Sequence, residues 1–325
     1  MISEVHPQRA YLNTPQRGFV LVVVLWVLAI LTVVTLSFGH RTMLERRATT
    51  YTLDQSLARM QARGAVQRGI VEIRNKAFED YSDSEEWTSV THLGQKWARP
   101  MDLYKEGGYF QRQPEAENDV VMLSIQDAES RISINSASQE LLDNVPNISP
   151  TVRRRIMSRR MRGEQEGEPG SYFQAIEEIR YMQGVRDEHW FGDERTPGLR
   201  TMLTLHGHMI NINTASPEVL ACIPGVDPAA ISTLMNYRNG PDGKRGTADD
   251  RHFNDLNEDL LNKVGPLGDS LVSLRQHCKV TSDYYIITGM ATRRSGAVVA
   301  IVTATVQVMG NHASVIGWRE GNFES

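Results

Sequence analysis

Residues 19–38 read FVLVVVLWVLAILTVVTLSF, an apolar run of twenty residues near the N-terminus of the 325-residue chain. The run carries no charge, and Thr32, Thr35 and Ser37 are its only polar residues. A helix of this length is about 30 Å long, which matches the hydrocarbon core of a bilayer and exceeds the apolar part of a secretory signal. The run therefore predicts a single transmembrane helix. The alternative is a buried helix of a soluble domain.

The chain as a whole has an ordinary globular balance, with 35 Lys and Arg against 39 Asp and Glu and a net charge of −4. This balance excludes collagen, low-complexity disorder and a polytopic membrane protein, and it argues against a protein that coats nucleic acid through a basic excess. Cys222 and Cys278 are the only cysteines, which excludes a four-cysteine zinc site. Two interpretations are open for these cysteines. They can form a disulfide if the chain lies in an oxidising compartment, or Cys222 can be a buried thiol.

A short polar leader ends at Gly18, and the apolar run begins abruptly at Phe19. Here the sequence resembles the type IV prepilins and pseudopilins. The resemblance implies that a prepilin peptidase cuts between Gly18 and Phe19, that residues 1–18 are removed and that Phe19 is N-methylated. Most members carry a Glu at the fifth mature position, where this chain has Val23. The large minor pseudopilin K of type II secretion systems is the recurrent exception in that family.

Helical spacing continues beyond the apolar run. Apolar and small residues recur three, four or seven positions apart, namely Tyr51, Ala58, Ala62, Ala65, Val66, Ile70, Ile73 and Ala77. This periodicity predicts one helix from Phe19 to about Ala77, so that residues 19–78 form a transmembrane and extended N-terminal helix.

Four β-rich runs follow in two pairs, residues 119–126 with 130–134 and residues 278–288 with 297–308. Neither pair alone buries enough surface to be stable, so we expect one antiparallel sheet packed on the outer half of the helix. The sequence thus predicts an α+β domain made of residues 79–134 and 276–310, followed by a tail at 311–325.

The intervening residues 135–275 contain an internal repeat with an offset of 78 residues, seen in SINSASQELLDNVPNISP and NINTASPEVLACIPGVDP. The eight identical positions of the first copy are Ile134, Asn135, Ala137, Ser138, Glu140, Leu142, Pro146 and Pro150. In each copy Ser136 or Thr214 can cap a helix, a Pro-containing turn leads into a second helix, and Phe173 or Phe253 opens a third. The pattern predicts an inserted all-α domain of two repeats, 132–200 and 210–275.

Both copies resemble helix-hairpin-helix units, which occur in DNA-uptake proteins and as the paired SAM-like domains of pseudopilin K. A DNA-binding hairpin uses a glycine-rich turn whose N–H groups approach a phosphate. The turn of the first copy, residues 146–149, has no glycine, and the second has Gly225 but also Asp227. These turns make a nucleic-acid partner the less favoured alternative. It is supported by the first copy's basic cluster, formed by Arg153, Arg154, Arg155, Arg159, Arg160 and Arg162.

Residues 239–253 (NGPDGKRGTADDRHF) form an acidic, glycine-punctuated loop in the second copy. Such a loop can turn carboxylates and carbonyls toward Ca2+, which takes six to eight oxygen ligands. The candidate ligands are the carboxylates of Asp242, Asp249 and Asp250, the Thr247 hydroxyl and the Arg245 carbonyl. The spacing is not that of an EF-hand, and a solvated turn is the alternative. Pseudopilin K domains bind calcium, so the resemblance favours the calcium interpretation.

Motifs of catalysis are missing from the sequence, which contains no P-loop, zinc-protease helix or Gly-x-Ser-x-Gly elbow. His206 and His208 suit a strand, but no third His or Cys lies nearby in the sequence. We therefore expect a protein that is not an enzyme.

The order of these segments resembles pseudopilin K over nearly the whole chain. That resemblance implies a minor pseudopilin at the tip of the type II secretion pseudopilus, which primes assembly with minor pseudopilins I and J for protein export across the outer membrane. It implies a single-pass protein of the cell inner membrane with most of its chain in the periplasm, in contact with a secreted substrate. The alternatives are a membrane-anchored helix-hairpin-helix DNA-uptake protein and a single-span receptor with an uncleaved N-terminus.

Overall fold

The computed structural model of the chain describes residues 17–83, 90–106, 118–166, 172–245, 247, 249–294, 296–310 and 312–321. The chain divides into two compact units, Met1–Ser56 and Leu57–Ser325. Most of the expected leader, residues 1–16, lies outside the described residues.

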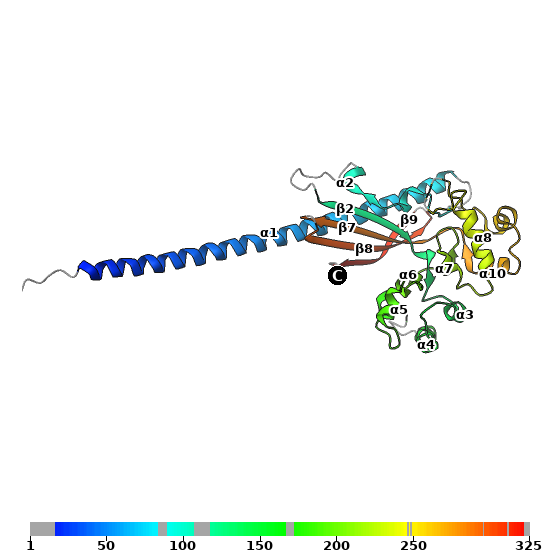
Figure 1. Cartoon of the computed structure of the whole chain (residues 1–325). Coiled ribbons are helices and arrows are strands. Elements are labelled where there is room, and N and C mark those ends of the chain that lie inside the picture. Colours follow the sequence, from blue (N-terminus) through cyan, green and yellow to red (C-terminus); the bar gives the residue numbers. More distant parts are fainter. Residues whose placement is uncertain are drawn as a thin grey trace, which may run out of the picture. The chain divides into compact units, whose positions relative to one another are not determined.

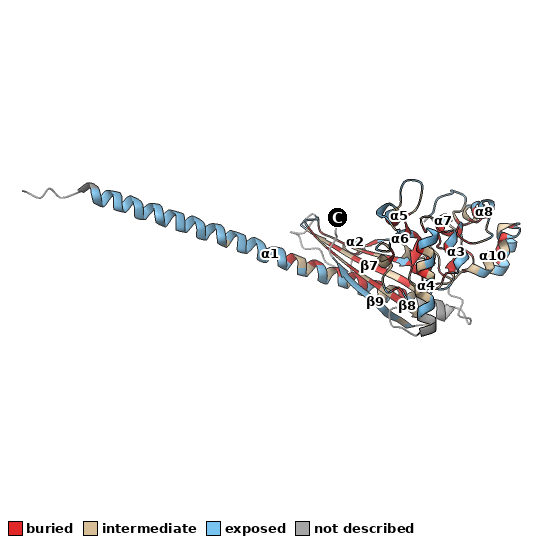
Figure 2. Cartoon of the chain, turned by 90° about the horizontal axis from the view of Figure 1, so that it is seen from below, coloured by how far each residue is buried: buried red, intermediate tan, exposed pale blue. Residues whose placement is uncertain are grey.

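Helix α1 (Arg17–Asp83) contains the apolar run, so the predicted long helix is confirmed, although it ends at Asp83 rather than near Ala77. It is long and apolar enough to cross a membrane by length and composition. In the first unit its apolar side chains are exposed (Figure 2), and Trp26 is 67% exposed. Exposure of an unbroken apolar surface in water is unfavourable, so this part of α1 requires an apolar partner.

The second unit is built on a five-stranded antiparallel sheet in the order β1-β2-β7-β8-β9 (Figure 1). Its strands are β1 (Met101–Asp102), β2 (Val120–Asp127), β7 (Tyr284–Arg293), β8 (Val298–Met309) and β9 (His312–Gly321). Two short helices, η1 (Lys96–Ala98) and α2 (Leu103–Glu106), flank β1. Strands β2, β7 and β8 alternate buried and half-buried residues, as one face of the sheet packs on the outer part of α1.

Two glycines allow this close packing of helix on sheet. A Cβ at Gly289 of β7 would collide with the backbone carbonyl oxygen of Ala62 on α1. A Cβ at Gly69 of α1 would lie 2.5 Å from Ile287 Cγ2 and 2.9 Å from Leu123 Cδ1. The backbone contact makes glycine necessary at Gly289, whereas a Cβ at Gly69 would require the methyl ends of Ile287 and Leu123 to move.

The insertion leaves the sheet after β2 and returns to it at β7. Its first copy contains η3 (Ala128–Ser130), β3 (Ile132–Ser133), α3 (Gln139–Asp143), α4 (Pro150–Glu166), η4 (Ile176–Ile179), α5 (Asp187–Phe191), α6 (Leu199–Met202) and β4 (Leu203–Thr204). Its second copy contains β5 (Ile210–Asn211), α7 (Pro217–Leu220), α8 (Pro228–Arg238), α9 (Leu256–Asp259), the π-helix η5 (Leu260–Val264), α10 (Ser270–His277) and β6 (Cys278–Lys279). Both copies share one hydrophobic core, separate from the core between α1 and the sheet.

Three strand predictions differ from the structure. The run 130–134 does not join the main sheet, because β3 pairs in parallel with β4 and both of its residues are buried. The run 278–288 is divided between β6, which pairs in parallel with β5, and β7. The expected tail at 311–325 contains β9, an edge strand whose side chains are mostly exposed and whose sequence was not among the predicted β-rich runs.

The insertion also departs from the all-α prediction, since each copy is closed by a parallel pair of two-residue strands. The expected third helix is short in both copies, four residues in η4 and four in α9 before η5. The helix caps are Ser138 and Ser216, whose hydroxyls accept from Leu141 N and Val219 N. The sequence had predicted Ser136 and Thr214 as the caps, and this prediction is wrong.

Candidate functional site

An asparagine clamp recurs in the two copies of the repeat. Asn135 accepts a hydrogen bond from Phe173 N at 2.9 Å and donates to Phe173 O at 3.0 Å. Asn213 makes the same two bonds with Phe253, at 2.8 and 2.9 Å. The repeat found in the sequence is therefore a structural repeat, in which each Asn fixes the start of the segment that follows the second helix.

An arginine holds the second helix of each copy against the first. Arg160 donates to Ala137 O at 2.6 Å, and Arg238 donates to Ala215 O at 2.7 Å. Arg238 is only 4% exposed. Burial, and to a smaller extent the nearby Arg245, lower the pKa of Arg238 to about 9. These two arginines stabilise the repeats from within.

The hairpin turns are equivalent in backbone conformation. Asn147 has φ 67° and Gly225 has φ 77°, so an asparagine fills the left-handed position in the first copy. In the second copy the Asp227 carboxylate accepts from Ala230 N at 2.7 Å and caps α8. A negative charge thus lies at the helix end that a phosphate contact would use.

Most arginines of the basic cluster are engaged within the insertion. Arg153 forms an ion pair with Asp143, and Arg159 pairs with Glu178 at 2.7 Å. Arg155 donates to Gln183 O at 2.7 Å. The exposed members are Arg154 and Arg162. The cluster is therefore largely a set of structural contacts.

The acidic loop places three carboxylates around one hydroxyl. Thr247 Oγ1 lies 2.7 Å from Asp249 Oδ1, 3.3 Å from Asp250 Oδ1 and 3.4 Å from Asp242 Oδ1. Asp249 also accepts from Asp242 N at 3.0 Å. The Thr247 hydroxyl and the Asp242 N–H hold the pKa of Asp249 below its usual range, so this carboxylate is charged at neutral pH.

Two backbone contacts anchor this loop to the repeat. The Arg245 guanidinium donates to Thr214 O at 2.7 Å, and Arg251 N donates to Arg238 O at 2.8 Å. Among the residues that the structure describes, no three His, Cys, Asp or Glu side chains are arranged to hold a metal ion. The loop therefore gathers the predicted carboxylates without presenting them as a finished site, and calcium binding stays a prediction.

A buried polar network that sequence reasoning missed joins the insertion to the sheet. Asp127, at the end of β2, is 3% exposed. Its Oδ2 accepts from Thr214 Oγ1 at 2.5 Å, Ser282 Oγ at 2.6 Å and Asn211 Nδ2 at 2.9 Å, and its Oδ1 accepts from Glu129 N at 2.8 Å. Burial raises the pKa of Asp127, although these four hydrogen bonds oppose the rise. No spacing motif marks the network, since its members come from three separate segments, residues 127–129, 211–214 and 282.

An ion pair lies beside this network. Glu129 is 1% exposed, and its carboxylate lies 2.8 Å from Lys279 Nζ and accepts from Asp283 N at 2.7 Å. Burial raises the pKa of Glu129 to about 7, despite the opposing effect of Lys279. Burial lowers the pKa of Lys279, but Glu129 and Asp283 more than offset this and raise it overall.

Glu129 makes the stability of the fold depend on pH. Between about pH 4.5 and 7 the folded state holds a proton that the unfolded chain has lost, so the contribution of Glu129 declines as the pH rises through this window. We expect the free energy of unfolding to fall by about 2–3 kcal/mol more in the wild type than in Glu129→Gln between pH 5 and pH 8. Glu188→Gln, at an exposed carboxylate, should keep the wild-type slope. Parallel pH profiles for wild type and Glu129→Gln would contradict the assignment.

The other predicted site residues lie in the insertion and at the start of α1. Cys222 and Cys278 are buried free thiols in the structure, and a disulfide between them in an oxidising compartment stays a prediction. Burial raises the pKa of each to about 12, so neither is a reactive thiolate. Gly18 and Phe19 lie in the first turns of α1, where Phe19 is 67% exposed. Cleavage between them stays a prediction.

Comparison with known proteins gives a structural likeness. No family model matches the chain, and no curated protein matches it. The fold is similar to that of a chain in the crystal structure of the GspK-GspI-GspJ complex from the enterotoxigenic Escherichia coli type 2 secretion system. The TM-score is 0.52 at 14% sequence identity, over 87% of this chain and 100% of that chain. The chain therefore has a type II secretion pseudopilin-like fold.

Proposed function

We propose that this protein is a minor pseudopilin of a type II secretion system. The observation that carries the proposal is the combination of an exposed apolar helix with a pseudopilin-like sheet interrupted by a large insertion. That combination is similar in fold to a chain of the GspK-GspI-GspJ complex, most of this chain being covered. The resemblance to pseudopilin K that the sequence carries points in the same direction.

The proposed mechanism is mechanical. Residues 19–38 are first held in the inner membrane, and after removal of the leader they pack against the apolar helices of partner pseudopilins. Both environments cover the surface that is exposed in the single chain. Val23 stands where most pseudopilins carry Glu, and it suits a subunit with no neighbour above it. A position at the pseudopilus tip, where the chain primes assembly with pseudopilins I and J, is the specific form of the proposal.

The test of this function is co-expression of the full chain with a prepilin peptidase and two smaller minor pseudopilins. We expect a detergent-stable complex and, by mass spectrometry, a mature chain that begins with N-methylated Phe19. Gly18→Glu should leave the leader uncleaved, because the peptidase would no longer meet a glycine before the cut. A mature wild-type chain that keeps its leader, or one that binds neither pseudopilin, would overturn the proposal.

The acidic loop is proposed to bind calcium as part of this function. Asp242, Asp249 and Asp250 fit a hard cation, because their oxygens already converge on Thr247 in a loop anchored at both sides. When bound, the ion supplies a fixed positive charge that holds the loop closed. The residues themselves position the carboxylates and tie the loop to the repeat through Arg245.

We expect calorimetry on the full chain to show calcium binding that weakens at least about tenfold in Asp249→Ala, because a charged ligand is lost. Calcium should raise the unfolding temperature of the wild type and not that of the variant. Asp193→Ala, which removes an exposed carboxylate elsewhere in the insertion, is the matched control. Unchanged binding in Asp249→Ala and in Asp250→Ala would exclude this loop.

A second candidate function is DNA uptake through the hairpin copies, which is favoured by the exposed Arg154 and Arg162 of α4. Among the described side chains neither is in an ion pair. Salt-dependent binding of duplex DNA by the full chain would support this candidate, and the absence of binding at low salt would eliminate it.

A further inference from the structure

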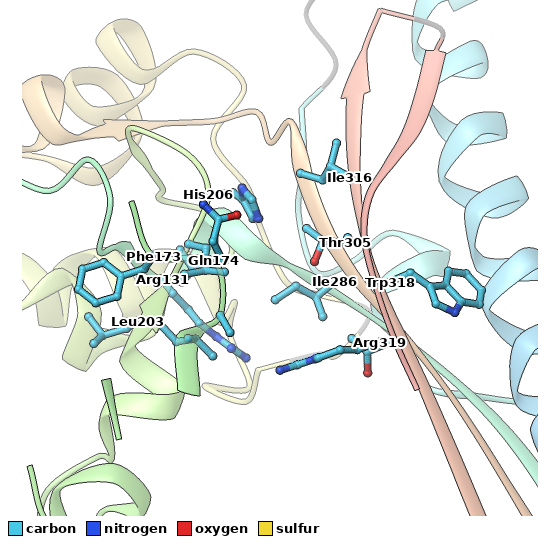
Figure 3. Close-up of a pocket in the computed structure, with 16 residues that line it drawn as sticks. Arg131, Phe173, Gln174, Leu203, His206, Ile286, Thr305, Ile316, Trp318 and Arg319 are labelled. Atoms are coloured by element: carbon cyan, nitrogen blue, oxygen red, sulfur yellow. The ribbon is translucent and has the colours of Figure 1, made fainter. Parts of the chain in front are cut away.

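A groove lies between the insertion and the sheet face that points away from α1. It encloses about 280 Å³, and its lining comes from the insertion, from β7 and β8, and from the edge strand β9. Arg131, Leu205 and Thr204 line one wall, while Ile286, Thr305 and Arg319 line the other. Figure 3 shows Arg131 and Arg319 reaching toward one another across it, with Trp318 on the opposite face of β9.

Arg131 is a cation held without a carboxylate partner. It donates to Gln126 Oε1 at 2.7 Å and to Arg200 O at 3.4 Å, and within the described part of the chain no acidic oxygen lies within 4.0 Å of its nitrogens. Burial lowers its pKa, and only the field of Asp127 opposes this. Arg319, by contrast, is paired with Glu177. The groove therefore keeps a partly desolvated positive charge, which is unfavourable unless an anion compensates it.

The mouth of the groove is bordered by a free sheet edge. Within the described residues β9 pairs only with β8, and it is ten residues long with no proline. The opposite edge strand, β1, has two residues. Edge strands of natural sheets are usually short or blocked. Strand β9 instead presents backbone groups that are unpaired on its outer side over Gly317–Gly321, beyond its bulge.

The geometry of a strand places alternate side chains on one face. In β9 Arg319 lies opposite Thr303 and faces the groove, while Trp318 lies opposite the buried Ala304 and faces α1. A strand added to β9 would repeat this alternation, so every second side chain would point into the groove. The side chains that alternate with these would point to the opposite face of the sheet, where an apolar one would meet Trp318, which is 39% exposed.

We propose that the edge of β9 and this groove bind an extended segment of a partner protein, which adds a strand to the sheet and places one carboxylate against Arg131. The backbone groups of β9 supply affinity, and the guanidinium selects an acidic side chain by a bidentate contact. A free carboxylate compound would use Arg131 without the edge, so the row of backbone groups argues for a peptide. The inference concerns this surface alone and does not depend on the pseudopilus role.

The test uses the full chain in detergent micelles and a labelled peptide, TVTVEVTVT, with blocked ends. Its Glu and Thr side chains would face the groove, and its Val side chains would face Trp318. We expect it to bind about tenfold more tightly than TVTVQVTVT, the cost of one charge-assisted contact. Arg131→Gln should erase this preference, whereas Arg154→Gln, an equal change of charge on exposed α4, should keep it. Circular dichroism would verify that Arg131→Gln is folded.

Methylated peptides test the strand itself. N-methylation of alternate residues blocks the N–H groups along one edge of an extended peptide, and the two alternating sets block opposite edges. One set should abolish binding and the other should retain it. No binding of TVTVEVTVT, equal binding of both methylated peptides, or an unchanged preference for Glu in Arg131→Gln would each overturn the proposal.

Discussion

Asp127→Ala is expected to lower the free energy of unfolding by about 3–5 kcal/mol, the largest loss we anticipate from one side chain. Asp127 accepts four hydrogen bonds in a site where it is 3% exposed. Removing the carboxylate leaves Ser282 Oγ and Glu129 N without this acceptor in a region that water does not reach. Burial of an unsatisfied donor costs about 1–3 kcal/mol, and several donors are affected together.

The same substitution should loosen the insertion from the sheet. Asp127 ends β2, Ser282 precedes β7, and Asn211 and Thr214 belong to the second copy, so one carboxylate joins the exit and return of the chain. Asn211 Nδ2 also donates to Thr91 O at 3.1 Å, which adds the segment after α1 to the junction. We therefore expect faster amide exchange in Asp127→Ala in the second copy than in the central strands β7 and β8.

Asp193→Ala is the matched control for this prediction. Asp193 also accepts two backbone hydrogen bonds, from Arg195 N at 2.8 Å and Thr196 N at 2.7 Å, but the site is exposed. Water can replace its carboxylate, so the loss should be below about 1 kcal/mol. Chemical denaturation of the full chain in detergent, followed by tryptophan fluorescence, compares the two. A loss for Asp127→Ala no greater than that for Asp193→Ala would contradict the role of the network.

The elements that the sequence predicted well are those in which one pattern continues over many residues. The periodicity from Phe19 onward predicted α1, and the β-rich runs 119–126 and 297–308 predicted β2 and β8. Strand β9 was missed because an exposed edge strand does not need an alternating apolar pattern. The parallel pairs β3–β4 and β5–β6 were missed because two buried residues carry no period at all.

Predictions about the site differed for a related reason. The repeat was visible because eight identical residues keep one spacing, and the structure gives both copies the same asparagine clamp. The loop carboxylates were found because they are close in sequence. Asp127, Asn211 and Ser282 are far apart along the chain, so only the fold brings them together. Arg131 was missed because its importance depends on its place in the groove, where its guanidinium contacts Gln126 and not a carboxylate among the described residues.

The asparagine clamps provide the second large effect, and the repeat supplies its own comparison. Asn213→Ala should cost about 2–4 kcal/mol, because Asn213 is 4% exposed and Phe253 N and O would both be left unpaired. Asn135→Ala removes the same two bonds in the first copy. Asn135 is half-buried, so water can reach its site, and we expect a cost of about 1–2 kcal/mol.

A third substitution separates the clamp from the general effect of losing an amide. Asn239→Ala removes the amide of a half-buried residue whose hydrogen bond to Gly243 O is long, at 3.4 Å, and exposed to water, so it should cost less than about 0.5 kcal/mol. Unfolding of the full chain measures all three variants under the same conditions. Equal costs for Asn213→Ala and Asn135→Ala would show that burial does not set the difference between the copies. A cost for Asn213→Ala as small as that for Asn239→Ala would show that the clamp does not hold the repeat together.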